Sequence, residues 1–168
     1  ELFDLAPALA SAGGVPASGF RVFDETLAAG NRVKGITAPG MAHASRREID
    51  ELTDMVKRFG AKGLVHLAVQ EDGALHGPIA KFLAPETQAA VRGAAGAGEG
   101  DLILIVADLS DTANDVLGRL RVELGGRLGL ANPDELAYCW VHHFPMYQWD
   151  EPFKRWDATH NPFSGVLP

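Results

Sequence analysis

Two long segments of the chain repeat apolar residues at the spacing of an amphipathic helix. In the first, residues 45–59, the recurring positions are Ile49, Leu52, Val56 and Phe59. Ser45 and Glu48 match a capping box at its start, and Gly60 supplies a stop. In the second, residues 111–128, they are Val116, Leu117, Leu120, Leu124 and Leu128. Residues three and four positions apart share one helical face, so each segment is predicted to be a helix with a buried apolar stripe.

Other segments carry the patterns of β-strands. Residues 64–70 alternate between two faces, and the turn at 71–73 after them predicts a return strand. Residues 101–107 form an almost continuous apolar run, which predicts a central strand covered on both faces. Residues 20–23 predict a further strand, with residues 32–37 as its pairing partner.

The remaining stretches predict shorter elements. The first 19 residues are rich in alanine, glycine and proline, and a short helix near residues 4–10 followed by a loop fits them. Pro85 suits the first turn of a short helix that runs to Val91.

The character of the sequence changes after residue 133. Aromatic residues gather there, including the three tryptophans Trp140, Trp149 and Trp156. Strands near 137–143 and 155–159, joined through a turn at 150–152, predict a β-hairpin that belongs to a different structural unit.

These elements predict an α+β fold with a small antiparallel or mixed sheet, two long helices packed on it, and a C-terminal β-hairpin segment. We predict three parts of the chain. Residues 1–19 form a linker with a short helix, residues 20–130 a compact domain, and residues 131–168 the separate C-terminal segment.

Composition and charge narrow the classes of function. Apolar residues make up 46% and charged residues 22% of the chain, which is enough for a buried core. The net charge of −7 argues against a stand-alone nucleic-acid binder, although a module beside a basic domain stays compatible with it. The sequence contains no apolar run of membrane-spanning length and no signal-like N-terminus, so we expect a cytoplasmic location without membrane association.

Side chains that could carry chemistry are few. A single cysteine, Cys139, excludes an internal disulfide, and its apolar neighbours predict a buried, inert thiol. His142, His143 and His160 are the only plausible metal set, but adjacent strand residues point to opposite faces, so we expect no metal site. His66 is interpreted as a structural, half-exposed histidine.

The C-terminal strip resembles a known family. Residues 140–151 read WVHHFPMYQWDE and residues 159–164 read THNPFS, similar to the catalytic core of bacterial aspartyl-tRNA synthetases. Upstream, short motifs follow the order of the GAD domain that this family carries as an insertion: FRVF at 20–23, GAKGL at 60–64, PIAKFL at 78–83, GD at 100–101 and LGRLR at 117–121.

The resemblance implies that the chain is a GAD-like inserted domain, residues 20–130, with a partial class II catalytic-core segment, residues 131–168. The parent enzyme would be an aspartate–tRNA ligase that activates L-aspartate with ATP and Mg²⁺ and transfers it to tRNA-Asp as a homodimer. The motifs that hold ATP and the metal in that family have no counterpart here, so this chain alone is expected to be inactive and to carry no catalytic residue or cofactor.

One substrate-binding residue follows from the resemblance. His160 matches the first histidine of a family pair that contacts aspartate. The pattern departs from the family at three positions, where His143, Asn161 and Ser164 replace an acid, a histidine and a threonine.

Contact with the acceptor arm of tRNA is a further expectation. Lys62, Lys81, Arg119 and Arg121 are the candidate phosphate contacts, and ordinary surface charges explain them equally well. One alternative is a non-enzymatic tRNA-binding module like the tail of the aspartyl/glutamyl-tRNA amidotransferase B subunit, which gives residues 137–168 no role. Another is an unrelated small-molecule enzyme that uses His142, His143 or His160.

Overall fold

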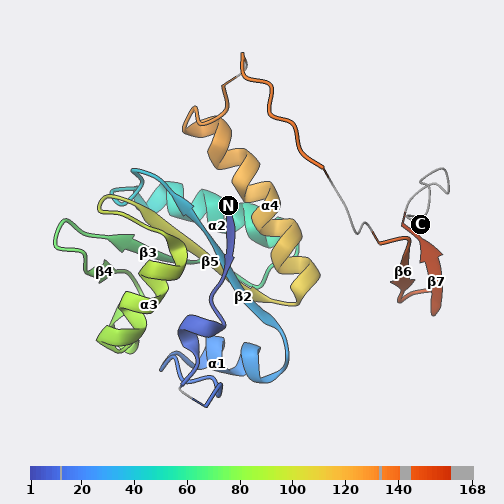
Figure 1. Cartoon of the computed structure of the whole chain (residues 1–168), viewed down its shortest axis with the longest axis horizontal. Coiled ribbons are helices and arrows are strands. Elements are labelled where there is room, and N and C mark those ends of the chain that lie inside the picture. The colour runs from blue at the N-terminus through green and yellow to red at the C-terminus, as the bar shows by residue number, and fades with distance from the viewer. Residues whose placement is uncertain (12, 133, 141–144, 160–168) are drawn as a thin grey trace. The chain divides into compact units, whose positions relative to one another are not determined.

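The computed structural model describes residues 1–11, 13–132, 134–140 and 145–159 (Figure 1). It divides into two compact units, Glu1–Ala131 and Asn132–Pro168. His142, His143, His160, Asn161 and Ser164 lie outside the described residues.

The first unit is built on a five-stranded sheet in the order β1-β2-β5-β3-β4, and every neighbouring pair is antiparallel. Its strands are β1 (Leu2–Asp4), β2 (Arg32–Ala38), β3 (Val65–Val69), β4 (Leu75–His76) and β5 (Leu102–Asp108). The central position of β5 confirms the prediction made from its apolar run. Leu104 and Val106 join the apolar cluster on one face of the sheet, whereas Ile103 and Ile105 join the cluster on the other.

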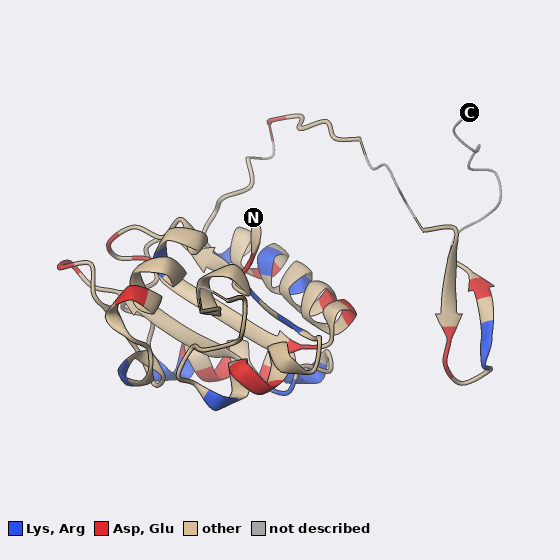
Figure 2. Ribbon diagram, turned by 60° about the horizontal axis from the view of Figure 1, so that its bottom comes forward, with Lys and Arg blue, Asp and Glu red and all other residues tan. Residues whose placement is uncertain are grey.

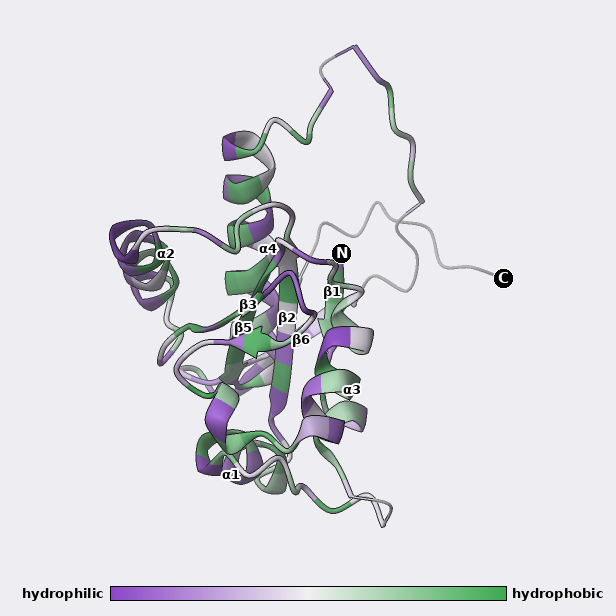
Figure 3. Ribbon diagram, turned by 90° about the vertical axis from the view of Figure 1, so that its left-hand side faces the viewer, coloured by the Kyte–Doolittle hydropathy of each residue, from purple (hydrophilic) through white to green (hydrophobic). Residues whose placement is uncertain are grey.

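Helices cover both faces of this sheet. They are α1 (Arg21–Ala28), α2 (Arg46–Arg58), α3 (Pro85–Ala95) and α4 (Ser110–Arg127), with 3₁₀ turns η1 (Pro7–Leu9) and η2 (Ala80–Phe82). The long helices α2 and α4 pack on one face, while η1, α1 and α3 pack on the other. Figure 3 shows α2 and α3 on opposite sides of the sheet. The α+β prediction, with two long helices on a small sheet, is confirmed.

The predicted strand at residues 20–23 is wrong, because Phe20 is the N-cap of α1 and residues 21–23 lie in its first turn. Ser18 and Asp24 fix the start of that helix: the Ser18 amide donates to Asp24 Oδ1 over 2.8 Å, and the Phe20 amide donates to Ser18 Oγ over 3.0 Å. The helix then buries Phe23 completely against the sheet. Strand β2 pairs instead with β1 and β5.

The N-terminal residues belong to the core of the first unit. The predicted helix near residues 4–10 is reduced to η1, because Leu2–Asp4 pairs with β2 as strand β1. Leu5 and Leu9 are 0% and 1% exposed in the cluster beneath α1 and α3. The predicted domain boundary at residue 19 remains a prediction, which the variants in the Discussion test.

The second unit contains a β-hairpin of β6 (Tyr147–Asp150) and β7 (Arg155–Ala158). Trp149 and Trp156 face each other across it, with ring centroids 5.7 Å apart in a T-shaped arrangement. The first strand was expected at 137–143, but residues 137–140 form no strand and 141–144 lie outside the described residues. Cys139 is exposed, so the prediction of a buried thiol is wrong: without a strand there, no sheet covers it.

The predicted capping box at the start of α2 is confirmed. Ser45 Oγ accepts the Glu48 amide, and the Glu48 carboxylate accepts the Ser45 amide over 2.8 Å. The hydrogen bonds from the Ser45 hydroxyl and amide hold the pKa of the Glu48 carboxyl below its usual value. Because the pKa of Glu48 is lower in the folded state, its hydrogen bonds with Ser45 stabilise the fold fully above the usual glutamate pKa. This stabilisation is lost as the pH falls through the lowered pKa.

We therefore expect Ser45→Ala to lower the free energy of unfolding by about 1 kcal/mol at neutral pH. Urea unfolding measures this difference, which should shrink when the pH falls below the ordinary glutamate pKa of 4.5. Ser110→Ala is the control, because α4 begins without a side-chain cap. Equal losses in the two variants would contradict the role of the capping box.

Candidate nucleic-acid interface

The four cations expected to contact phosphate lie apart in the structure. Lys81 belongs to η2, and its Nζ lies 5.0 Å from the ring centroid of Phe82. Arg119 and Arg121 both belong to α4, but two positions along a helix separate side chains by roughly 200°. Lys62 lies between α2 and β3. The fold therefore does not assemble these four side chains into one surface.

Lys62 has a structural partner in Asp108, the last residue of β5. Asp108 is only 4% exposed, and its carboxylate accepts the amides of Lys62 and Leu109 over 3.1 and 2.9 Å. The Lys62 ammonium lies 4.0 Å from the same carboxylate, and its side chain remains 78% exposed. The backbone of Lys62 thus satisfies a buried acid, while its charge stays accessible to solvent.

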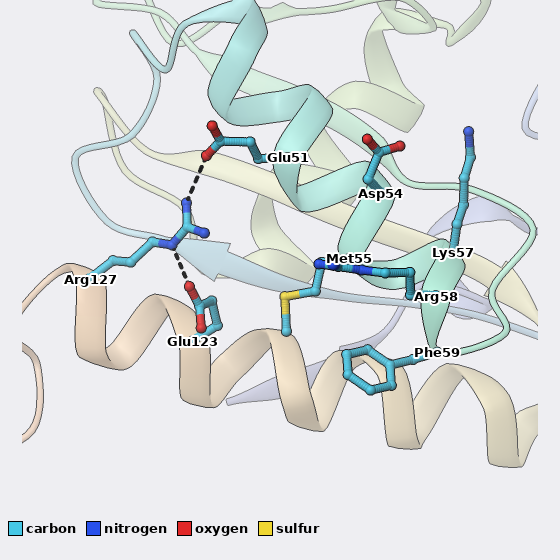
Figure 4. A pocket seen from close by; sticks show the side chains of 8 residues that line it. All are labelled: Glu51, Asp54, Met55, Lys57, Arg58, Phe59, Glu123 and Arg127. Atoms are coloured by element: carbon cyan, nitrogen blue, oxygen red, sulfur yellow. Dashed lines mark hydrogen bonds and ion pairs between the residues drawn. The ribbon is translucent and has the colours of Figure 1, made fainter.

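The packing of α2 against α4 creates a groove of about 920 Å³ (Figure 4). At one end, Arg127 Nε lies 2.6 Å from Glu123 and Arg127 Nη1 lies 3.7 Å from Glu51. Because two carboxylates already neutralise this guanidinium, it is a poor partner for a further anion such as a phosphate. This end of the groove ties the two helices together.

The other end is lined by Lys57, Arg58 and Phe59, and Arg119 of α4 lies over the Phe59 ring. We name these four residues the basic–aromatic patch. The Arg119 guanidinium lies 4.4 Å from the centroid of the Phe59 ring, and its Nε lies 2.9 Å from Asp115. Lys57 and Arg58 make no ion pair with the described acidic residues. Figure 4 shows Phe59 directed toward α4 and Lys57 directed away from it.

The prediction that Phe59 completes the buried stripe of α2 is wrong. It follows the last helical residue and is 41% exposed, whereas Leu52 and Val56 are buried. The ring therefore presents one face to Arg119 and leaves part of its surface to solvent.

The patch has the chemistry of a phosphate and base contact. Ammonium and guanidinium groups bind phosphate oxygens, and an exposed aromatic ring accepts a stacked base. Both signs of charge are interspersed over the helices in Figure 2, so the patch is a local feature of an acidic chain. Sequence analysis missed Lys57 and Arg58, although their position beside an aromatic residue at the end of α2 was a usable signal.

The remaining candidate chemistry concerns metal binding, membrane association and the contact to aspartate. Among the described residues, no group of three or more histidine, cysteine, aspartate or glutamate side chains is placed to hold a metal ion. None of the described helices is long and apolar enough to cross a membrane. His160, the residue expected to contact aspartate, lies outside the described residues.

Comparison with known proteins finds a family model described as the GAD domain, which matches residues 23–117. The chain is 46% identical over 149 residues to an aspartate–tRNA(Asp/Asn) ligase of Syntrophotalea carbinolica, covering 89% of this chain and 25% of the relative. It is 43% identical over 166 residues to an aspartate–tRNA ligase of Lactiplantibacillus plantarum, covering 98% of this chain and 27% of the relative. The chain thus spans about a quarter of the length of the relatives that it matches.

Proposed function

Since this chain belongs to the GAD domain family, we propose that it is the accessory domain inserted into an aspartate–tRNA ligase, together with adjoining residues of that enzyme. The parent enzyme activates L-aspartate with ATP and Mg²⁺ and transfers it to tRNA-Asp, acting as a cytoplasmic homodimer. The similarity to named ligases over 89% of the chain supports this proposal and favours it over the amidotransferase-type module. His160 is proposed as the contact to aspartate.

ATP and Mg²⁺ belong to other parts of the parent enzyme in this proposal. The described residues supply no acidic cluster that could hold a metal ion, so no step of the reaction is assigned to them. Their part is to bind and orient the RNA.

The basic–aromatic patch is the proposed contact to tRNA. The observation that supports it is the stack of Arg119 on Phe59, the residue that follows the exposed Lys57 and Arg58 in the chain. Arg119 keeps the ring in place, and its outer donors remain available to a phosphate, because only its Nε is paired with Asp115. The two free cations extend the contact along the RNA backbone.

Binding of labelled tRNA-Asp to the whole chain tests the patch. We expect binding that weakens with salt, and an affinity at least about tenfold lower when Lys57, Arg58 and Arg119 are all changed to glutamine. The slope of log K against log salt should become shallower by about two to three, since each lost phosphate contact removes about one. Fluorescence anisotropy at several salt concentrations provides both quantities.

Two further triple variants complete the design. Arg21→Gln, Arg32→Gln and Lys34→Gln remove the same charge at another place and should leave the salt slope nearly unchanged. Lys62→Gln, Lys81→Gln and Arg121→Gln test the contacts expected from the sequence. Equal losses in all three triple variants would show that only net charge matters, and absence of binding at low salt would refute the tRNA contact.

A further inference from the structure

A second pocket lies on the face of the sheet that α2 and α4 cover, at the edge formed by β3 and β4. It measures about 540 Å³, within the usual range for small-molecule sites. Its apolar lining includes Ala44, Ile49, Ala68 and Leu102. The alanines leave room above the sheet, so the lining suits a flat apolar group.

Four polar side chains from three elements line this pocket. Arg46 and Asp50 come from the first two turns of α2, His66 from β3 and His76 from β4. His76 pairs in register with Ala68, two residues after His66, so both imidazoles lie on the face that α2 covers. A guanidinium, a carboxylate and two imidazoles therefore surround one apolar cavity.

The backbone beside His76 fixes the shape of the pocket. Gly77 lies so close to β3 that a Cβ atom there would stand 2.5 Å from the carbonyl oxygen of His66. Only glycine allows this approach, which holds the residues after β4 against β3. The cavity is thus pre-formed by the fold.

We propose that this pocket binds a nucleoside monophosphate whose base carries an exocyclic amino group. The base lies on the apolar lining, and Asp50 accepts a hydrogen bond from its amino group. Arg46 and His76 donate to the phosphate, and His66 hydrogen-bonds the ribose hydroxyls. An apolar floor, a carboxylate acceptor and a guanidinium donor are the three kinds of contact that an amino-bearing base and a phosphate need.

The state of His66 agrees with this arrangement. Burial lowers the pKa of its imidazole, and His76 adds to the effect while Asp50 opposes it. A neutral imidazole has one donor and one acceptor, which suits a hydroxyl group. Bound phosphate brings negative charge into the pocket beside Arg46, His76 and Asp50, so nucleotide binding should raise the pKa of His66.

Binding of AMP to the whole chain, measured by calorimetry, tests the proposal. AMP and CMP should bind more tightly than UMP, which lacks the amino group, while adenosine and inorganic phosphate should bind at least about tenfold more weakly than AMP. Arg46→Gln should weaken AMP binding about tenfold. Arg47→Gln is the matched control, because Arg47 lies outside the pocket and its Nε is 3.0 Å from Glu51.

Histidine NMR signals provide an independent measurement. His66 and His76, assigned through His66→Gln and His76→Gln variants, should shift on addition of AMP, and the pKa of His66 should rise. Unchanged signals at saturating AMP would overturn the proposal. So would equal losses in Arg46→Gln and Arg47→Gln, or phosphate that binds as tightly as AMP, which would mark an anion contact without a nucleotide pocket.

Discussion

A chain in which Leu5 and Leu9 are both replaced by alanine is expected to lose at least about 4 kcal/mol of unfolding free energy, since each buried Leu→Ala change costs about 2–5 kcal/mol. Both side chains are almost completely buried in the cluster beneath α1 and α3. Whole domains are stable by only about 5–15 kcal/mol, so this loss is a large share of the total and should lower the midpoint of thermal unfolding by many degrees. Thermal and urea unfolding followed by circular dichroism measure the loss.

The control is Val15→Ala in the same N-terminal segment, where Val15 is 62% exposed. A surface change of this kind should alter stability by less than about 0.5 kcal/mol. A double variant as stable as the control would show that residues 1–19 are dispensable for the first unit, in agreement with the predicted boundary at residue 19. A large loss would place them within the domain.

Phe23→Ala is expected to cost about 3–5 kcal/mol, the usual loss for a buried phenylalanine. The Phe23 ring is completely buried on the sheet face that α1 covers, and its centroid lies 5.0 Å from that of Phe20 in an edge-to-face arrangement. Its removal leaves a cavity that the neighbouring strands cannot fill. Equilibrium urea unfolding gives the difference.

Val22→Ala is the matched control in the same turn of α1, because Val22 is 47% exposed. If Phe23→Ala cost no more than this change, α1 would not contribute to the core.

Several features could be predicted from the sequence because they depend on local spacing. Helices α2 and α4 repeat their apolar residues over three or more turns, and the capping box of Ser45 and Glu48 marks where α2 begins. The short apolar run of residues 101–107 predicted a central strand covered on both faces, which β5 is. The order of short motifs along the chain was sufficient to identify the family.

Other features depend on contacts between distant parts of the chain. Residues 20–23 are too few for periodicity to distinguish a helix from a strand, and burial of Phe23 against the sheet decides for the helix. Leu2–Asp4 becomes a strand only because β2 offers it an edge. Cys139 has apolar neighbours in sequence, but no packed element covers it.

In the candidate interface, too, some features follow from local spacing and others from contacts between distant residues. The sequence by itself determined the two helices and the type of residue along them. Only the packing of α2 on α4 brought Arg119 onto Phe59, and it left Lys81 on a different element. The pocket of His66 and His76 likewise exists only in the folded sheet. Spacing in the sequence determines which side chains lie together on one face of a helix or strand. Tertiary packing determines which of these faces meet.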